Sequence, residues 1–277
     1  MDFKTATRLF FALTFVAIGC IGLVSGTFAP MWDQVPKTMP ARELLAYLST
    51  FVTLACGAGL LVKRTAARAA LALLIFLVLW TTAFKFPYIA RHPLVEGSYQ
   101  YNGENWVLIA AAWVLYAEFA PRSTFPAGNV GLRIAYVLYG LGLIAFGFSH
   151  FFYLDMTTPL IPTYLPGSPV FWAYLTGCAW LVTGVALVAG FAVRIAALLS
   201  AVEIALITLL VWGPRVLAGQ MSPGRWTETV VSWALTASAL VVAASFGRRP
   251  WLGRYRLATR DRAEPDAFSD TSVSVVG

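Results

Sequence analysis

Stretches of about twenty mostly apolar residues recur along this chain, and they constrain its fold more than any other feature. The hydrocarbon core of a bilayer is about 30 Å thick, a distance that about 20 helical residues cross. Lipid offers no hydrogen-bond partners, so each stretch must pair its own backbone groups as a helix. The alternation typical of strands is missing from the sequence. We therefore predict an all-α integral membrane protein.

We count eight such stretches and predict a membrane-spanning helix in each. Only 12% of the residues are charged, against about 25% in a typical soluble protein. The first apolar run continues to Ala29, which is too long for the core of a signal peptide, so we expect a retained helix. Pro87 and Pro214 are expected to end the third and seventh helices. The predicted spans are residues 9–29, 43–62, 66–84, 104–120, 132–153, 169–189, 192–212 and 227–246.

The formal net charge of +7 would, taken alone, suggest a nucleic-acid partner. The positive charges lie at the ends of the apolar stretches, where membrane topology places them. We therefore predict contact with the lipid bilayer and no nucleic-acid partner. If the N-terminus is cytoplasmic, most Lys and Arg residues fall on the cytoplasmic side, which predicts that both termini are cytoplasmic. The sequence carries no signal for an oligomeric state.

The chain also repeats itself. Val35–Pro40 resembles Ile161–Pro166, which lies 126 residues later. Other pairs at nearly the same offset are Arg8 and Arg133, Gly22 and Gly147, Tyr47 and Tyr174, and Pro87 and Pro214. A consistent offset across four helices predicts two four-helix units in tandem, which lie parallel in the membrane because four is even.

The predicted domains follow from this repeat. The first unit covers residues 1–125 and the second covers residues 126–247. Residues 248–277 form a cytoplasmic tail that is first basic and then acidic and Ser-rich, and we expect its second part to be disordered.

Several residues of these units point to a known family. In the second unit a glycine and a histidine, Gly147 and His150, end the first helix, and the stretch Ala173–Leu199 follows a segment bracketed by two prolines. In the first unit, "GENW" at Gly103–Trp106 starts the fourth helix, although Ser25 stands where the second unit has His150. The chain resembles the DoxX and DoxX-like family of four-helix membrane proteins.

The resemblance implies a location in the bacterial cytoplasmic membrane and a role associated with quinone or thiol redox chemistry. Relatives include a small subunit of a thiosulfate:quinone oxidoreductase. A redox partner subunit and a quinone are therefore the partner and cofactor that the resemblance implies.

Glu203 lies near the middle of the seventh predicted span. An ionised carboxylate at that depth costs at least about 2.5 kcal/mol, and such residues often mark proton sites or pathways. The alternative is a protonated carboxyl that hydrogen-bonds a neighbouring helix. The counterpart in the first unit is Phe76 or Leu77, so the polar centre belongs to the second unit.

A second group of polar residues is expected near the outer membrane face. His150 titrates near neutral pH and could pass protons to a quinone or to a substrate oxygen. The alternative is an aromatic belt at the interface, with Phe151, Phe152 and Tyr153 as anchors at the same depth as Trp32, Trp106, Trp172 and Trp226. We take His150 and Glu203 as candidate catalytic residues. The candidate substrate-binding residues are Asp155, Tyr153, Glu104 and Glu228.

Other chemistries find little support in the sequence. Cys20, Cys56 and Cys178 form no C-x-x-C pair, which disfavours a thiol–disulfide enzyme. His92 and His150 are the only histidines, and His92 lies in a predicted loop, so we predict no intrinsic metal or haem site. Three functions stay open: a quinone-associated redox component, a small-molecule carrier or export factor, and a scaffold subunit without chemistry. Whether the chain is an enzyme is left open with them.

Overall fold

The computed structural model describes residues 1–121, 123–247 and 250–253, and within them it contains helices and no strands. Apolar composition and cap residues explain the helix ends: Asp2 and Ser168, for example, accept hydrogen bonds from the first turns of α1 and α8. The long helices are α1 Phe3–Ser25, α2 Arg42–Leu61, α3 Lys63–Trp80, α5 Glu96–Phe119, α6 Asn129–Phe152, α8 Pro169–Ala189, α9 Val193–Leu217 and α10 Pro223–Ser245. The short ones are η1 Pro30–Trp32, η2 Thr81–Lys85, α4 Phe86–Arg91, α7 Leu154–Thr157 and η3 Thr158–Leu160.

Seven helical stretches among the described residues are long and apolar enough to cross a membrane, which agrees with a multi-pass membrane protein. The predicted fourth span, residues 104–120, falls in α5 except for its last residue, and α5 is not one of the seven. This helix carries polar residues in its first half, among them Asn102 and Asn105, and both are fully buried. Protein rather than lipid surrounds much of α5, because it packs against α3, α6 and α10.

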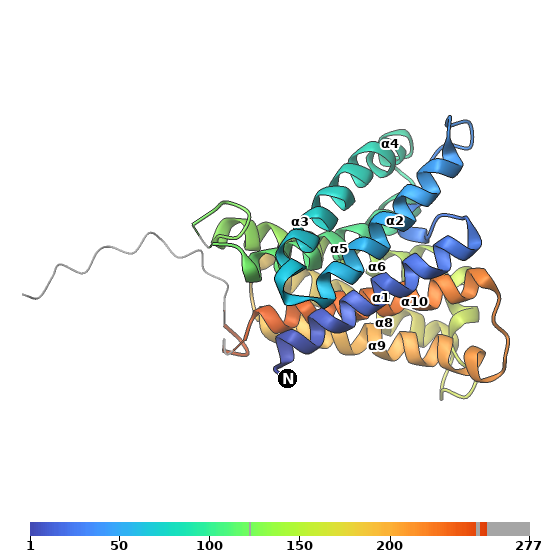
Figure 1. The fold of residues 1–277 in the computed structure, drawn as a ribbon. Coiled ribbons are helices and arrows are strands. Elements are labelled where there is room, and N and C mark those ends of the chain that lie inside the picture. The colour runs from blue at the N-terminus through green and yellow to red at the C-terminus, as the bar shows by residue number, and fades with distance from the viewer. Residues whose placement is uncertain (122, 248–249, 254–277) are drawn as a thin grey trace, which may run out of the picture.

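The helices run roughly side by side in one bundle (Figure 1). Contacts connect α1, α2, α3 and α5 in series, and likewise α6, α8, α9 and α10. The two series meet where α5 packs on α6 and where α10 packs on α1, and α5 also contacts α10. We call the end of the bundle where α1 ends and α5, α8 and α10 begin the distal end, and the end that holds the N-terminus the proximal end.

Small residues allow close approach between α6 and α8. A Cβ atom added to Gly140 would lie 2.7 Å from the carbonyl oxygen of Gly184, and one added to Gly184 would lie 2.7 Å from the carbonyl oxygen of Gly140. No side chain fits at either position without moving a backbone, so these glycines set the distance between the two helices.

Two arginines hold corresponding places in the two series of helices. The Nη1 atom of Arg8 in α1 donates to the carbonyl oxygen of Leu60 at 3.2 Å, near the end of α2. The Nη1 atom of Arg133 in α6 donates to the carbonyl oxygen of Leu187 at 3.0 Å, near the end of α8, and its Nη2 atom donates to that of Val188. Each arginine thus donates to carbonyl groups in the last turn of a helix, where backbone donors within the helix run out.

The prediction that Pro87 and Pro214 end their helices is wrong. Pro87 lies in the first turn of α4, and the helical stretch that begins at Lys63 continues through a π-helical turn to Arg91. Pro214 lies inside α9, which continues to Leu217. A π-helical turn already changes the hydrogen-bond pattern before Pro87, so the missing N–H of that proline breaks no regular bond.

Candidate functional site

A cavity of about 770 Å³ lies between α8 and α9 at the distal half of the bundle. One wall comes from the last turn of α6, and the segment that carries α7 and η3 lines the distal end. Most of its lining is apolar. The lining residues are His150, Thr157, Leu160, Ile161, Pro162, Leu165, Trp172, Ala173, Leu175, Thr176, Cys178, Ala179, Val182, Thr183, Leu199, Val202, Glu203, Leu206, Ile207, Leu210 and Val211.

His150 is partly buried in the last turn of α6 and lines this cavity. Its Nδ1 atom lies 2.8 Å from the carbonyl oxygen of Phe146. A carbonyl oxygen only accepts hydrogen bonds, so Nδ1 carries a proton. In the neutral imidazole, Nε2 is then an acceptor.

Glu203 lines the opposite wall, on α9. Its Oε1 atom is buried and has no hydrogen-bond partner in the described part of the protein. The two threonines that line the wall formed by α8 are already satisfied, because Thr176 donates to the carbonyl of Trp172 and Thr183 to that of Ala179. Glu203 therefore presents an unsatisfied polar atom to an otherwise apolar space.

His150 and Glu203 lie at nearly the same depth. The helices α8 and α9 are antiparallel and joined by a short turn, so Glu203, ten residues after the start of α9, is level with Ala179, ten residues before the end of α8. The Cβ atom of His150 would lie 3.0 Å from a Cβ atom added to Gly177. His150 is thus level with Gly177 and Glu203 with Ala179. Two residues of α8 separate these levels, which is about 3 Å along the helix axis at 1.5 Å per residue. The structure brings the two candidate catalytic residues to one cavity.

The four candidate substrate-binding residues do not line this cavity. The Tyr153 hydroxyl accepts a hydrogen bond from the Gly97 amide at 2.9 Å, so it connects the segment before α7 to the start of α5. Asp155 is exposed on α7. Glu104 on α5 and Glu228 on α10 interact electrostatically with each other at the distal end of the bundle.

A second polar region surrounds Lys85, which follows directly on an apolar stretch and is not marked in the sequence as a buried residue. Its side chain is 0% exposed, and Nζ donates to the carbonyl oxygens of Tyr101 at 2.9 Å and Pro30 at 3.4 Å. Glu104 lies within electrostatic range of Lys85. Lys85 ends the π-helical turn η2, a type of turn that often occurs at functional sites, but the sequence has no mark by which this turn could be recognised.

Trp32 does not belong to an interfacial belt, and this part of the belt hypothesis is wrong. It is only 1% exposed, and its Nε1 atom donates to Thr53 Oγ1 at 2.9 Å. The Nε1 atom of Trp80 in turn donates to the carbonyl oxygen of Trp32 at 3.2 Å. Phe152, in contrast, is 66% exposed, as expected of an interfacial anchor. The loop after α1 folds back into the bundle and buries Trp32 between helices.

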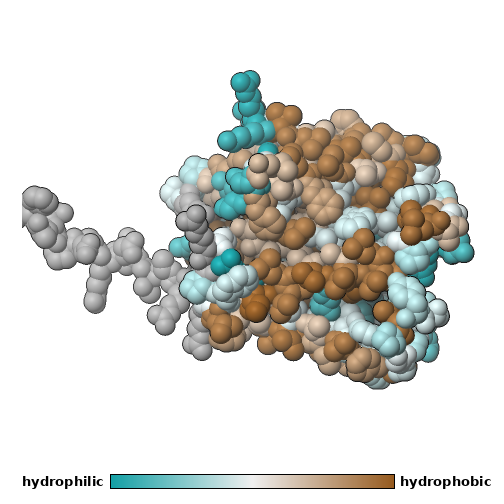
Figure 2. Space-filling view, turned by 90° about the horizontal axis from the view of Figure 1, so that it is seen from below, coloured by the Kyte–Doolittle hydropathy of each residue, from teal (hydrophilic) through white to brown (hydrophobic). Residues whose placement is uncertain are grey.

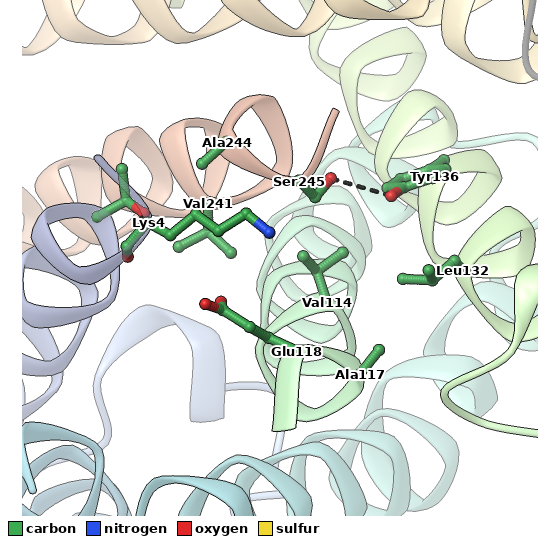
Figure 3. A pocket seen from close by; sticks show the side chains of 10 residues that line it. Lys4, Val114, Ala117, Glu118, Leu132, Tyr136, Val241, Ala244 and Ser245 are labelled. Atoms are coloured by element: carbon green, nitrogen blue, oxygen red, sulfur yellow. Dashed lines mark hydrogen bonds between the residues drawn. The ribbon is translucent and has the colours of Figure 1, made fainter. Parts of the chain in front are cut away.

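A small polar pocket of about 90 Å³ lies at the proximal end, between α1, α5, α6 and α10. Figure 3 shows the side chains of Lys4 and Glu118 directed into it, and the hydrogen bond of 2.9 Å between the hydroxyl groups of Tyr136 and Ser245. A space of this size holds a few water molecules. None of the candidate site residues lies there.

Among the described residues, no group of three His, Cys, Asp or Glu side chains could hold a metal ion. Cys20, Cys56 and Cys178 are free thiols. A comparison of the chain with family models, curated proteins and solved structures finds no match.

Proposed function

We propose that this protein is a redox-associated membrane component that binds a quinone, or another apolar molecule dissolved in the bilayer, in the cavity between α8 and α9. In this function His150 and Glu203 handle the protons. The observation that carries the proposal is that these two side chains, from different helices and at similar depth, are the only histidine and acidic groups among the residues that line a largely apolar cavity.

The size and lining of the cavity support this proposal. A volume of about 770 Å³ falls within the range of cavities that bury small ligands. Such sites combine apolar walls with a few placed polar groups, and His150 Nε2 and Glu203 Oε1 are two polar atoms of this kind.

The proposal includes a finer architecture. We infer that α5 is the eighth membrane-spanning helix and that the two four-helix units are parallel repeats of a DoxX-like bundle. The corresponding contacts of Arg8 and Arg133 support the repeat, as do the matching contacts of α5 with α6 and of α10 with α1. The site then lies in the second unit, in the half of the membrane that is farther from the two cytoplasmic termini. We assign the redox centre to a partner subunit in the bacterial cytoplasmic membrane, as the family resemblance implies.

Quinone binding tests the proposal directly. Decylubiquinone and its reduced form, decylubiquinol, would be titrated into purified protein in nanodiscs, and their dissociation constants measured for the parent, Glu203→Gln and His150→Gln. Decylubiquinol, whose hydroxyl groups can donate to Nε2 and Oε1, should bind about 10-fold more weakly to each variant, because an amide is a weaker acceptor than the group that it replaces. Glu118→Gln, a matched change at the proximal pocket, should bind like the parent.

Other outcomes decide between the remaining functions. A parent protein that binds no decylubiquinone but accumulates a solute in proteoliposomes, in a manner that depends on Glu203, would be a carrier. A parent protein that does neither would favour a scaffold subunit.

A further inference from the structure

We propose that the occupant of the cavity is an uncharged lipid with a hydroxyl-bearing head, and that it reaches the cavity sideways from the bilayer between α8 and α9. This inference rests on the proposed function, because it concerns the same cavity, and it specifies the chemistry of the ligand and its route. In the complex, the hydroxyl group lies between His150 and Glu203 and the chain extends along the apolar walls.

The charges of the cavity exclude an anionic head. None of the lining residues is Lys or Arg. A phosphate or carboxylate would meet no cation there and would lie beside the carboxyl group of Glu203. An anion buried without a partner is strongly unfavourable, so phospholipids and fatty acids are poor occupants.

The hydrogen-bonding groups select a donor. The Nδ1 proton of His150 is directed to the Phe146 carbonyl, which leaves Nε2 as an acceptor. Glu203 Oε1 is buried without a partner in the described residues. A hydroxyl group can donate to Nε2 or to Oε1, whereas a hydrocarbon can donate to neither.

The segment with α7 and η3 forms a partial cover over the distal end of the cavity, where Leu160, Ile161, Pro162 and Leu165 line it. This cover is attached at both ends, because Trp172 Nε1 donates to the carbonyl oxygen of Pro166 at 2.7 Å and the Gly97 amide donates to the Tyr153 hydroxyl. A ligand that came from the water phase would have to pass this segment.

The side of the cavity toward the bilayer is open instead. Val182 on α8 and Val202 on α9 both line the cavity, yet they are 69% and 55% exposed. Figure 2 looks onto the face of the molecule that is lowest in Figure 1, where α9 lies, and this face is largely hydrophobic. A lipid can therefore pass from the membrane to the cavity without crossing a polar surface.

Three ligands that share one farnesyl chain and differ in their head group test the preference for an uncharged hydroxyl. Farnesol, farnesoic acid and farnesyl phosphate would be titrated at pH 8 into the full chain in nanodiscs. Farnesol should bind at least about 10-fold more tightly than either anion, because only the alcohol offers an uncharged donor. Equal or tighter binding of the acid or the phosphate would overturn the proposal, and so would the absence of farnesol binding.

A matched pair of tryptophan variants tests the route. Val202 and Val185 are both valines and both 55% exposed, but only Val202 lines the cavity. Val202→Trp should slow farnesol binding about 10-fold or more, whereas Val185→Trp should leave the rate unchanged. Val202→Phe is the second blocking variant, in case the tryptophan variant does not fold. If the folded blocking variant and Val185→Trp bind farnesol at the same rate, the route is wrong.

The decylubiquinone titration separates this proposal from the proposed function. Farnesol binding without decylubiquinone binding would leave the lipid site intact and refute the quinone function. Decylubiquinone binding that depends on His150 and Glu203, without preference for farnesol over its anions, would refute the lipid-alcohol proposal and leave the quinone function standing.

Discussion

The space between α8 and α9 is hollow, whereas the space between α2 and α3 is filled. At an offset of 127 residues, Glu203 and Ile207 correspond to Phe76 and Trp80. Glu203 and Ile207 line the cavity, but Phe76 and Trp80 pack with Trp32, at ring distances of 5.1 Å and 5.4 Å from it. Similar pairs of neighbouring helices therefore enclose either a core or a cavity, and the size of a few side chains decides which.

The polar groups of the two regions differ in the same way. Lys85 is fully buried and donates to two backbone carbonyls, so its ammonium group connects the loop after α1 to α5. Glu203 faces the cavity with an oxygen atom that has no partner in the described residues. We infer that the polar group near α3 stabilises the fold, whereas the one on α9 can meet a ligand.

Removal of Trp80 should lower the free energy of unfolding more than any other change proposed here. Trp80→Ala deletes a buried indole that packs on four aromatic rings, and large-to-small changes of this type cost about 3–5 kcal/mol. Unfolding of the purified protein, followed by circular dichroism in detergent, measures the loss. The matched control is Trp226→Ala, because Trp226 is 43% exposed and should cost much less. Equal losses in the two variants would mean that the filled region is not a packed core.

Replacement of Lys85 should have the next largest effect. Lys85→Met leaves the carbonyl oxygens of Pro30 and Tyr101 without this donor, which should cost about 2–3 kcal/mol. Lys37→Met, at an exposed lysine, should change the free energy of unfolding by less than about 0.5 kcal/mol. If Lys85→Met leaves the free energy of unfolding unchanged, Lys85 does not stabilise the fold.

Filling the cavity should alter affinity more than stability. Ile207→Trp places in the second half the side chain that Trp80 supplies in the first, and it should weaken decylubiquinone binding about 10-fold or more. Ile207→Leu conserves volume and should bind normally. Binding titrations and thermal unfolding of both variants measure the two effects. If the folded Ile207→Trp variant binds quinone as tightly as the parent, the quinone does not bind in this cavity.

Glu96 should give the smallest effect. It lies at the start of α5, outside the predicted span, and burial raises its pKa from 4.5 to about 7. The folded protein thus prefers the protonated carboxyl, so stability is highest below about pH 4.5 and declines as the pH rises to about 7. Because the side chain is only half buried, the change should be less than about 1 kcal/mol.

Glu96→Gln should remove this decline. The variant should unfold at a higher temperature than the parent at pH 8 and at the same temperature at pH 4.5. Thermal unfolding at the two pH values measures the difference. A difference at pH 4.5 as large as that at pH 8 would contradict the assignment to Glu96.

The sequence predicted much of the helical arrangement from apolar length. Seven of the eight predicted spans coincide with helices apolar enough to cross a membrane. The fourth lies in α5, whose buried polar residues lower its hydropathy. Helix ends were less predictable at Pro87 and Pro214, because a proline in a first turn, or one turn before the end of a helix, does not stop the helix.

By itself, the sequence determined that this protein is helical and enters a membrane, and that Glu203 lies deep within an apolar helix. Hydrophobic length along the chain is a local property, so no tertiary contact is needed to recognise it. Only the tertiary structure decided that Glu203 and His150 share a cavity, that Lys85 and Trp32 are buried, and that Tyr153 reaches Gly97. These facts depend on which helices are neighbours and on the side chains between them, and residues far apart in the sequence carry no local mark of such contacts.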